Sequence, residues 1–295
     1  MKNLAALLSL DVISEDNLLL FKQYGFTNRQ LAELWEVDSE AVQKKLQQFS
    51  IQPVYETIKG YQSSPDEKAA YYYATWKKDN SSYKKTAGEK VLIVGSGPIR
   101  IGQGIEFDYC SVQGIQALQK AGYETILMNN NPATVSTDYT LADKLYFEPV
   151  TVEDVLHVLE KEDTNRVIVQ FGGQTAINLA NELEAAGVQM LGSNMDTIDM
   201  LEDRDRFYEY MNQVGVAHIP GLTAYSETDV YEKADKIGYP VLIRPSYVIG
   251  GQGMAILKDE TALRNYLEAQ IATVSYPILL DAYYPGKEEI GRAHV

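Results

Sequence analysis

The stretch Val91-Leu92-Ile93-Val94-Gly95-Ser96-Gly97 decides the fold of the middle of the chain. Four apolar residues in a row are typical of a strand buried on both faces, and the glycines after them predict a sharp turn. Beyond this turn, short apolar runs alternate with helical patterns. This alternation predicts an α/β fold with βαβ units and a Rossmann-like parallel sheet. Strands are expected at 90–94, 124–128, 144–147, 166–171 and 188–191, with helices at 105–121, 152–162, 175–186 and 196–214.

The glycine-rich turn has the wrong spacing for a dinucleotide-binding fingerprint. After Gly95 and Gly97 the next glycine is Gly102, five residues on, and Pro98 removes a backbone N–H. The second expected strand is followed by 129–132, Asn-Asn-Asn-Pro, where a ribose-binding acid would be expected. These departures favour a tight turn in a Rossmann-like domain over an NAD or FAD site.

Length, charge and cysteine content exclude several classes of protein. The chain has 295 residues, room for two or three domains, and a formal net charge of −15. Residues 1–88 hold 11 basic and 11 acidic side chains, so the excess of acid lies beyond them. An acidic body disfavours non-specific nucleic-acid binding. No apolar run could cross a membrane, and the first residues do not resemble a signal peptide. The single cysteine, Cys110, is expected in the core and predicts a reducing, cytoplasmic setting.

Residues 1–76 are interpreted as a small helical domain. Thr27 and Gln30 have the spacing of a capping box at the start of one helix, and Ser39–Phe49 has the apolar spacing of a second. Two short helices and a tight turn could be a DNA-binding helix-turn-helix or a packing domain, and the neutral charge favours packing. The polar segment 77–88 is expected to be a linker.

The segment 241–257 contains an arginine followed by a glycine-rich loop. An apolar strand delivers Arg244, Pro245 follows it, and Gly250, Gly251 and Gly253 come next. Guanidinium groups match phosphate oxygens, and glycines let backbone N–H groups approach them. A β-hairpin with a mobile turn and a surface arginine explains the pattern equally well. Strands are expected at 241–244, 254–257 and 277–281, as in an α+β unit. The charged run 202–207 alone suggests only a solvated helix face.

Several long segments together resemble one family, the large subunit of carbamoyl-phosphate synthetase. The resemblance covers roughly residues 20–288 and is carried by Gly95–Ser111, Asn131–Asp138, Leu145–Pro149, Val169–Thr175, Glu202–Phe207 and Arg244–Gly251. Ala133 departs from the glutamate usual in the family. The resemblance implies a helical oligomerisation domain at 1–76, the second pre-ATP-grasp domain at 89–200, and the first part of the second ATP-grasp domain, truncated, at 201–289.

The same resemblance implies the site residues. Arg204 and Arg244 would bind the ATP phosphates and act in catalysis, while Gly250 and Gly251 would form the phosphate loop. Residues 281–284 would lie along the adenine. The remaining nucleotide contacts would come from Ala282, Tyr284 and Glu288, and the wall beside the site from Gly95–Gly104, Glu106 and Asp108.

As implied by the family, the whole enzyme would use ATP and Mg²⁺ or Mn²⁺ to make carbamoyl phosphate from bicarbonate and glutamine-derived ammonia. This half would phosphorylate carbamate. Its partners would be a glutamine amidotransferase small subunit and further copies of itself, with no nucleic acid and no membrane. The alternatives are another ATP-grasp carboxylate–amine ligase or a helix-turn-helix protein.

The metal-binding acids are expected beyond the end of this chain, so no metal ligand is assigned within it and the fragment is expected to be inactive alone. Residues 290–295 can be encoded by a sequencing-adapter sequence and are expected to be a non-native tail. For this reason His294 is given no function.

Overall fold

The computed structural model describes residues 8–58, 71–77, 86–99, 104–245, 253–270 and 276–286. Two compact units can be distinguished within this part of the chain, with the change from one to the other between Gly192 and Ser193. Of the expected linker, 77 and 86–88 are described. The expected non-native tail at 290–295 lies outside the described residues.

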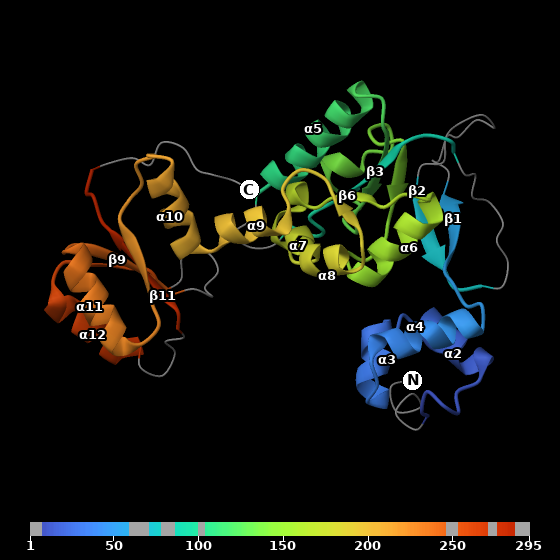
Figure 1. Cartoon of the computed structure of the whole chain (residues 1–295), viewed down its shortest axis with the longest axis horizontal. Helices are drawn as coiled ribbons and strands as arrows, with labels where there is room; N and C mark the ends of the chain where they lie inside the picture. The colour runs from blue at the N-terminus through green and yellow to red at the C-terminus, as the bar shows by residue number, and fades with distance from the viewer. Residues whose placement is uncertain are drawn as a thin grey trace. The chain divides into compact units, whose positions relative to one another are not determined.

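The first unit is built around a seven-stranded sheet (Figure 1). Its strands lie in the order β1-β2-β5-β4-β3-β6-β7. All neighbours run parallel except β1 and β2, which pair antiparallel. The bounds are β1 Val54–Ile58, β2 Tyr71–Thr75, β3 Lys90–Val94, β4 Glu124–Met128, β5 Lys144–Tyr146, β6 Arg166–Ile168 and β7 Gln189–Met190.

Helix α5 lies on one side of this sheet and α6, α7 and α8 lie on the other (Figure 1). The central strand β3 is fully buried, as its apolar sequence predicted. The α/β class and the parallel core are thereby confirmed. The helices are α5 Glu106–Lys120, α6 Val152–Glu162, α7 Gly173–Ile177 and α8 Ala180–Ala185, with 3₁₀ turns η1 Val135–Thr137 and η2 Gln170–Gly172.

The expectation of helical structure throughout residues 1–76 is wrong for the two strands β1 and β2. The ring of Tyr72 stacks on that of Tyr146 in β5, with centroids 5.0 Å apart, and Tyr55 meets the same ring edge-on at 5.2 Å. Tyrosine suits the half-buried surface of a sheet. Residues 54–58 and 71–75 therefore extend the parallel sheet instead of the helical bundle.

The helical part comprises α2 (Glu15–Gln23), α3 (Asn28–Trp35) and α4 (Ser39–Gln48). The Thr27–Gln30 capping box is present, with both of its hydrogen bonds formed. A common core holds the three helices together, made of Ile13, Leu18, Phe21, Leu31, Ala32, Trp35, Val42 and Leu46.

Two helices expected to be continuous are interrupted. The expected helix 175–186 is divided into α7 and α8, where Leu179 N–H donates to the Ala176 carbonyl, a tighter turn than the α-helix makes. The expected helix 196–214 breaks at Asp203. The expectation that Cys110 lies in the core is also wrong, because this side chain is exposed on α5.

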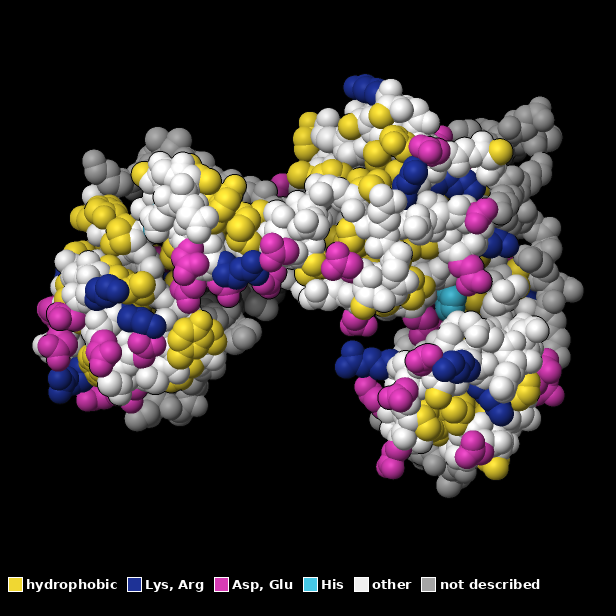
Figure 2. Space-filling model, viewed as in Figure 1, with side chains coloured by type: hydrophobic (Ala, Val, Ile, Leu, Met, Phe, Trp, Pro, Cys, Tyr) yellow, Lys and Arg dark blue, Asp and Glu magenta, His cyan; other side chains and the backbone are white. Residues whose placement is uncertain are grey.

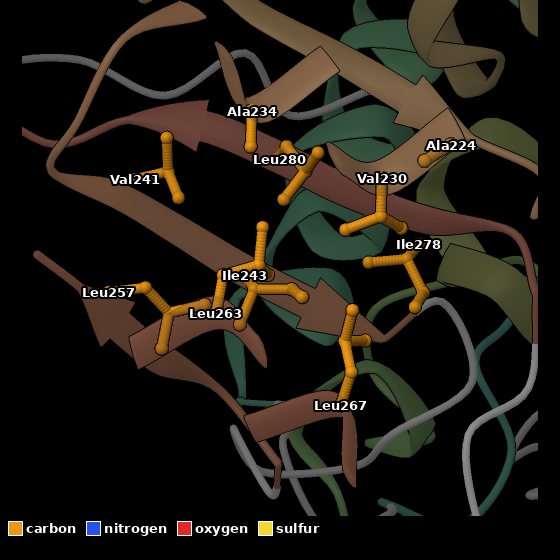
Figure 3. Packing of buried hydrophobic residues seen from close by; sticks show 10 residues of the cluster. All are labelled: Ala224, Val230, Ala234, Val241, Ile243, Leu257, Leu263, Leu267, Ile278 and Leu280. Carbon is orange, nitrogen blue, oxygen red and sulfur yellow. The ribbon is translucent and has the colours of Figure 1, made fainter. Parts of the chain in front are cut away.

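The second unit contains a four-stranded antiparallel sheet in the order β10-β9-β11-β8. Helices α11 and α12 pack their apolar sides against one face of it, as the close-up in Figure 3 shows. The three strands expected in this region are present, whereas β8, α11 and α12 were not predicted. The bounds are α9 Met195–Glu202, α10 Arg204–Gln213, β8 Gly221–Ala224, α11 Glu227–Ile237, β9 Val241–Pro245, β10 Ala255–Leu257, α12 Glu260–Gln270 and β11 Ile278–Ala282.

None of the helices in the described ranges has the length and apolar character needed to cross a membrane.

Candidate functional site

Arg244 projects from β9 on the face of the second sheet opposite to α11 and α12. Val241 and Ile243 on the same strand are fully buried in the core with these helices. Because side chains alternate along a strand, Arg244 points to the other face, where its side chain is 31% exposed. The antiparallel register places it opposite Leu279 of β11.

Asp281 holds the guanidinium of Arg244 from the neighbouring strand. Its carboxylate Oδ2 accepts a hydrogen bond from Arg244 Nη2, and its Oδ1 accepts one from the Tyr208 hydroxyl at 3.1 Å. Asp281 is only 4% exposed, so the ion pair is screened weakly on its side. The Arg244 Nε is buried and has no hydrogen-bond partner among the described residues.

From the sequence, Asp281 was expected only as part of the adenine-flanking stretch 281–284. A signal for its charge pairing was present, because a single acid ends the apolar strand Ile278-Leu279-Leu280. What the sequence could not show is that the acid faces Arg244, since that depends on the register between β9 and β11.

Arg204 is the first residue of α10, because the helix expected at 196–214 is interrupted at Asp203. Asp203 has an extended backbone and its Oδ1 accepts the N–H of Arg206 at 2.9 Å, which makes it the N-cap of a new helix. Arg204 is exposed. The neighbouring Arg206 is engaged by Asp196, at 2.7 Å, and by Asp199. Figure 2 shows acidic and basic side chains gathered near α9 and α10.

Tyr208 lies on α10, and its hydroxyl donates to Asp281. Burial raises the pKa of Tyr208 above its usual value, and the charge of Asp281 raises it further. The positive charges of Arg204 and Arg244 oppose this rise. The hydroxyl of Tyr208 and the guanidinium of Arg244 thus share the carboxylate of Asp281.

The positions of the other predicted site residues show no contact that bears on nucleotide binding. Ala282 ends β11, and its N–H donates to the Pro220 carbonyl at 2.8 Å. Tyr284 follows the strand and is 52% exposed. Gly250, Gly251 and Glu288 lie outside the described residues. The roles given to all these positions in nucleotide binding stay predictions.

In the first unit, Asp108 serves as an anchor for a loop. Its carboxylate accepts hydrogen bonds from the N–H of Ser136, at 2.7 Å, and from the Ser136 hydroxyl. It is 2% exposed, whereas Glu106 is exposed. Beside Asp108 an open depression of about 780 Å³ is lined by Ile99, Ile105, Tyr109, Val112, Pro132, Ala133, Thr134, Val135, Thr137, Asp138, Tyr139 and Leu141. The expected role of this region as an active-site wall stays a prediction.

Metal-ligating side chains are not clustered in the described ranges. No cluster of three or more His, Cys, Asp or Glu side chains there could hold a metal ion.

Comparison with known proteins identifies the family. Residues 87–200 match the carbamoyl phosphate synthase preATP-grasp domain, and residues 203–290 match the carbamoyl-phosphate synthase L chain, ATP binding domain. The carbamoyl phosphate synthase arginine-specific large chain of Halalkalibacterium halodurans is 51% identical over 281 residues, which are 95% of this chain and 27% of that protein. The protein of the same name from Geobacillus stearothermophilus is 50% identical over 284 residues, 96% of this chain and 27% of that one.

A solved structure that matches part of this chain is the biotin carboxylase domain of Hydrogenobacter thermophilus 2-oxoglutarate carboxylase. It is 22% identical, with a TM-score of 0.48, and the match covers 68% of this chain and 45% of that one. The chain spans 27% of the length of the curated relatives described above. Two adjacent domain matches and half-identical relatives along nearly its whole length show that the chain belongs to the carbamoyl-phosphate synthase large-chain family.

Proposed function

We propose that the chain is part of an ATP-dependent ligase that makes carbamoyl phosphate from bicarbonate, glutamine-derived ammonia and ATP, and that this half phosphorylates carbamate. Membership of the large-chain family and the match of residues 203–290 to an ATP-binding domain support the reaction class. The observation that carries the assignment to this sheet is the pair Arg244–Asp281, in which the Arg244 side chain is 31% exposed.

In this proposal the two arginines neutralise phosphate charge. Phosphoryl transfer spreads negative charge over the oxygens of the moving group, so catalysis depends on positioning and on electrostatic stabilisation. Arg244 is pre-oriented by Asp281 and keeps its charge at any physiological pH. Arg204 adds a second cation from the start of α10. Mg²⁺, whose ligands are expected beyond the end of this chain, would add further charge neutralisation.

The partners are also proposals. The curated relatives are named large chains, which supports a smaller glutamine amidotransferase subunit that supplies ammonia. Their arginine-specific names favour a role in arginine synthesis. Self-association through α2, α3 and α4 is proposed over DNA binding. On α4, Lys44 pairs with Glu40 at 2.7 Å and Lys45 lies over the Phe49 ring at 5.2 Å, so little free positive charge is offered to DNA.

The test uses the gene extended to its natural C-terminus. The purified protein is given carbamoyl phosphate and MgADP, and ATP formation is followed. The wild type is expected to form ATP, and Arg244→Ala to lose activity by about 10²–10³-fold. Arg264→Ala is the matched control, because Arg264 lies on α12 with an exposed partner, Glu260.

Two outcomes would count against the proposal. No ATP from a folded protein that binds nucleotide would leave an ATP-grasp ligase with a different substrate. Equal activity of Arg244→Ala and wild type would remove Arg244 from the phosphate site.

A further inference from the structure

We propose that Tyr208 is a positioning residue that fixes the guanidinium of Arg244 through Asp281. This inference rests on the proposed function, in which Arg244 binds nucleotide phosphate. Tyr208 was not singled out by the sequence, and it lies four residues after Arg204 on α10. The helix that begins with one arginine is thereby connected to the strand that carries the other.

The first step is the division of the Asp281 carboxylate between two donors. The Tyr208 hydroxyl donates to Oδ1 at 3.1 Å, and Arg244 Nη2 donates to Oδ2. The terminal torsion of an aspartate is broad, so one donor alone leaves the carboxylate free to turn. With a donor on each oxygen, its plane is set. The direction in which it holds the guanidinium is then set as well.

The second step is the rigidity of the surroundings of Tyr208. Its ring stacks on the imidazole of His218, with centroids 4.7 Å apart and planes 13° apart. His218 is in turn held by Asn212, whose Oδ1 lies 3.2 Å from Nε2. Beneath the cluster, a Cβ at Gly221 would lie 2.4 Å from Asp281 Oδ1 and 2.6 Å from the Tyr208 hydroxyl oxygen. The hydroxyl and the carboxylate are therefore closely confined.

The third step concerns what the arrangement leaves for a ligand. Arg244 is 31% exposed, and its Nε is buried without a partner in the described part of the chain. A guanidinium clamped at one end presents its other donors in a constant direction. Pre-orientation of this kind strengthens binding because less freedom is lost when the ligand arrives. Loss of this pre-orientation should therefore weaken the binding of phosphate-bearing ligands and leave the binding of the nucleoside alone unchanged.

Tyr208→Phe tests the inference, because it removes only the hydroxyl and keeps the ring on His218. Tyr210→Phe is the matched control: the same change on the same helix, at a side chain that is 37% exposed. Two quantities are measured on the 295-residue chain. The first is the Nε–H signal of Arg244 in ¹⁵N-arginine-labelled protein, assigned with Arg244→Lys. The second is the affinity for ADP and for adenosine by calorimetry.

Tyr208→Phe is expected to shift the Arg244 Nε–H signal and to speed its exchange with water. It should weaken ADP binding about fivefold, the factor that corresponds to one hydrogen bond of ~1 kcal/mol, and leave adenosine binding unchanged. Tyr210→Phe should change none of these.

An unchanged Arg244 signal in Tyr208→Phe would overturn the inference, as would equal losses of ADP and adenosine affinity. If the signal responds but the wild type binds no ADP, the proposed function fails while the link from Tyr208 to Arg244 stands.

Discussion

Arg244 and Asp281 form an ion pair across the neighbouring strands β9 and β11, on the face of the sheet opposite to the α11–α12 core. The two residues lie 37 positions apart in the chain. Their meeting depends on the antiparallel register that sets Leu242 opposite Asp281 and Arg244 opposite Leu279. This pair is the best-defined part of the candidate site, and it leads to the first prediction.

Asp281→Asn should weaken ADP binding about tenfold or more. The amide has the shape of the carboxylate but lacks its charge, and hydrogen bonds to charged groups are worth ~1.5–3 kcal/mol. Arg244 would then be held loosely. Calorimetry with ADP measures the change, and Asp235→Asn, at an exposed position of α11, is the control. Unaltered ADP affinity in Asp281→Asn would show that the ion pair has no part in binding.

Gly221→Ala should destabilise the second unit by about 1–3 kcal/mol. The added methyl would lie 2.4 Å from Asp281 Oδ1, a distance that forces the carboxylate or the strand to move. Urea unfolding, followed with one probe in each unit, measures the loss. Gly88→Ala is the control, because the nearest atom to its Cβ, Glu124 Oε2, is 3.7 Å away. Equal stability of the two variants would contradict the packing described around Gly221.

Lys22→Met should detach or weaken the contact between the helical part and the sheet of the first unit. The Lys22 side chain is 2% exposed, bonds Glu153 at 2.5 Å, and lies 4.7 Å from the centroid of the Trp76 ring. Removing Lys22 takes the cation away from the part-buried Glu153 carboxylate, although the N–H of Asn28 still donates to it at 2.7 Å, and should cost about 1.5–3 kcal/mol.

Chemical denaturation measures this change in stability. Lys44→Met is the control, since Lys44 and Glu40 form an exposed pair that solvent screens. Similar losses in both variants would mean that Lys22 contributes no more than a surface lysine.

Glu148→Gln should flatten the dependence of stability on pH between about 4.5 and 8. Burial raises the pKa of Glu148 to about 8, although the N–H of Ala74 partly opposes the rise. The unfolded chain releases this proton near its ordinary pKa of 4.5, so over this interval the folded chain binds more protons. The contribution of Glu148 to stability is therefore complete below pH 4.5 and is lost as pH approaches 8.

Urea unfolding at pH 5 and pH 8 measures that loss. Glu148→Gln should gain stability relative to the wild type as pH rises, whereas the exposed control Glu182→Gln should follow the wild type. A variant whose stability keeps the wild-type slope would show that Glu148 ionises normally in the folded chain.

The elements predicted best were those with purely local signals. β3 and β4 have the predicted bounds, and α6 starts after Thr151, whose hydroxyl accepts the N–H of Asp154 at 3.2 Å. Apolar runs and caps act over a few residues, so they can be recognised without knowing the partners. The break at Asp203 was missed because the apolar period continues across it. An aspartate inside such a pattern could be solvated as readily as it could cap a new helix.

The sequence by itself determined the α/β class, the central parallel strands, the capped helices and the resemblance to the carbamoyl-phosphate synthase large-chain family. The tertiary structure alone decided that residues 54–58 and 71–75 join the sheet, since strand pairing with β5 is a long-range contact. It also decided that Tyr208, Asp281 and Arg244 meet. Side-chain direction alternates along each strand, so which residues face one another depends on the register between strands and on the helix packed above them.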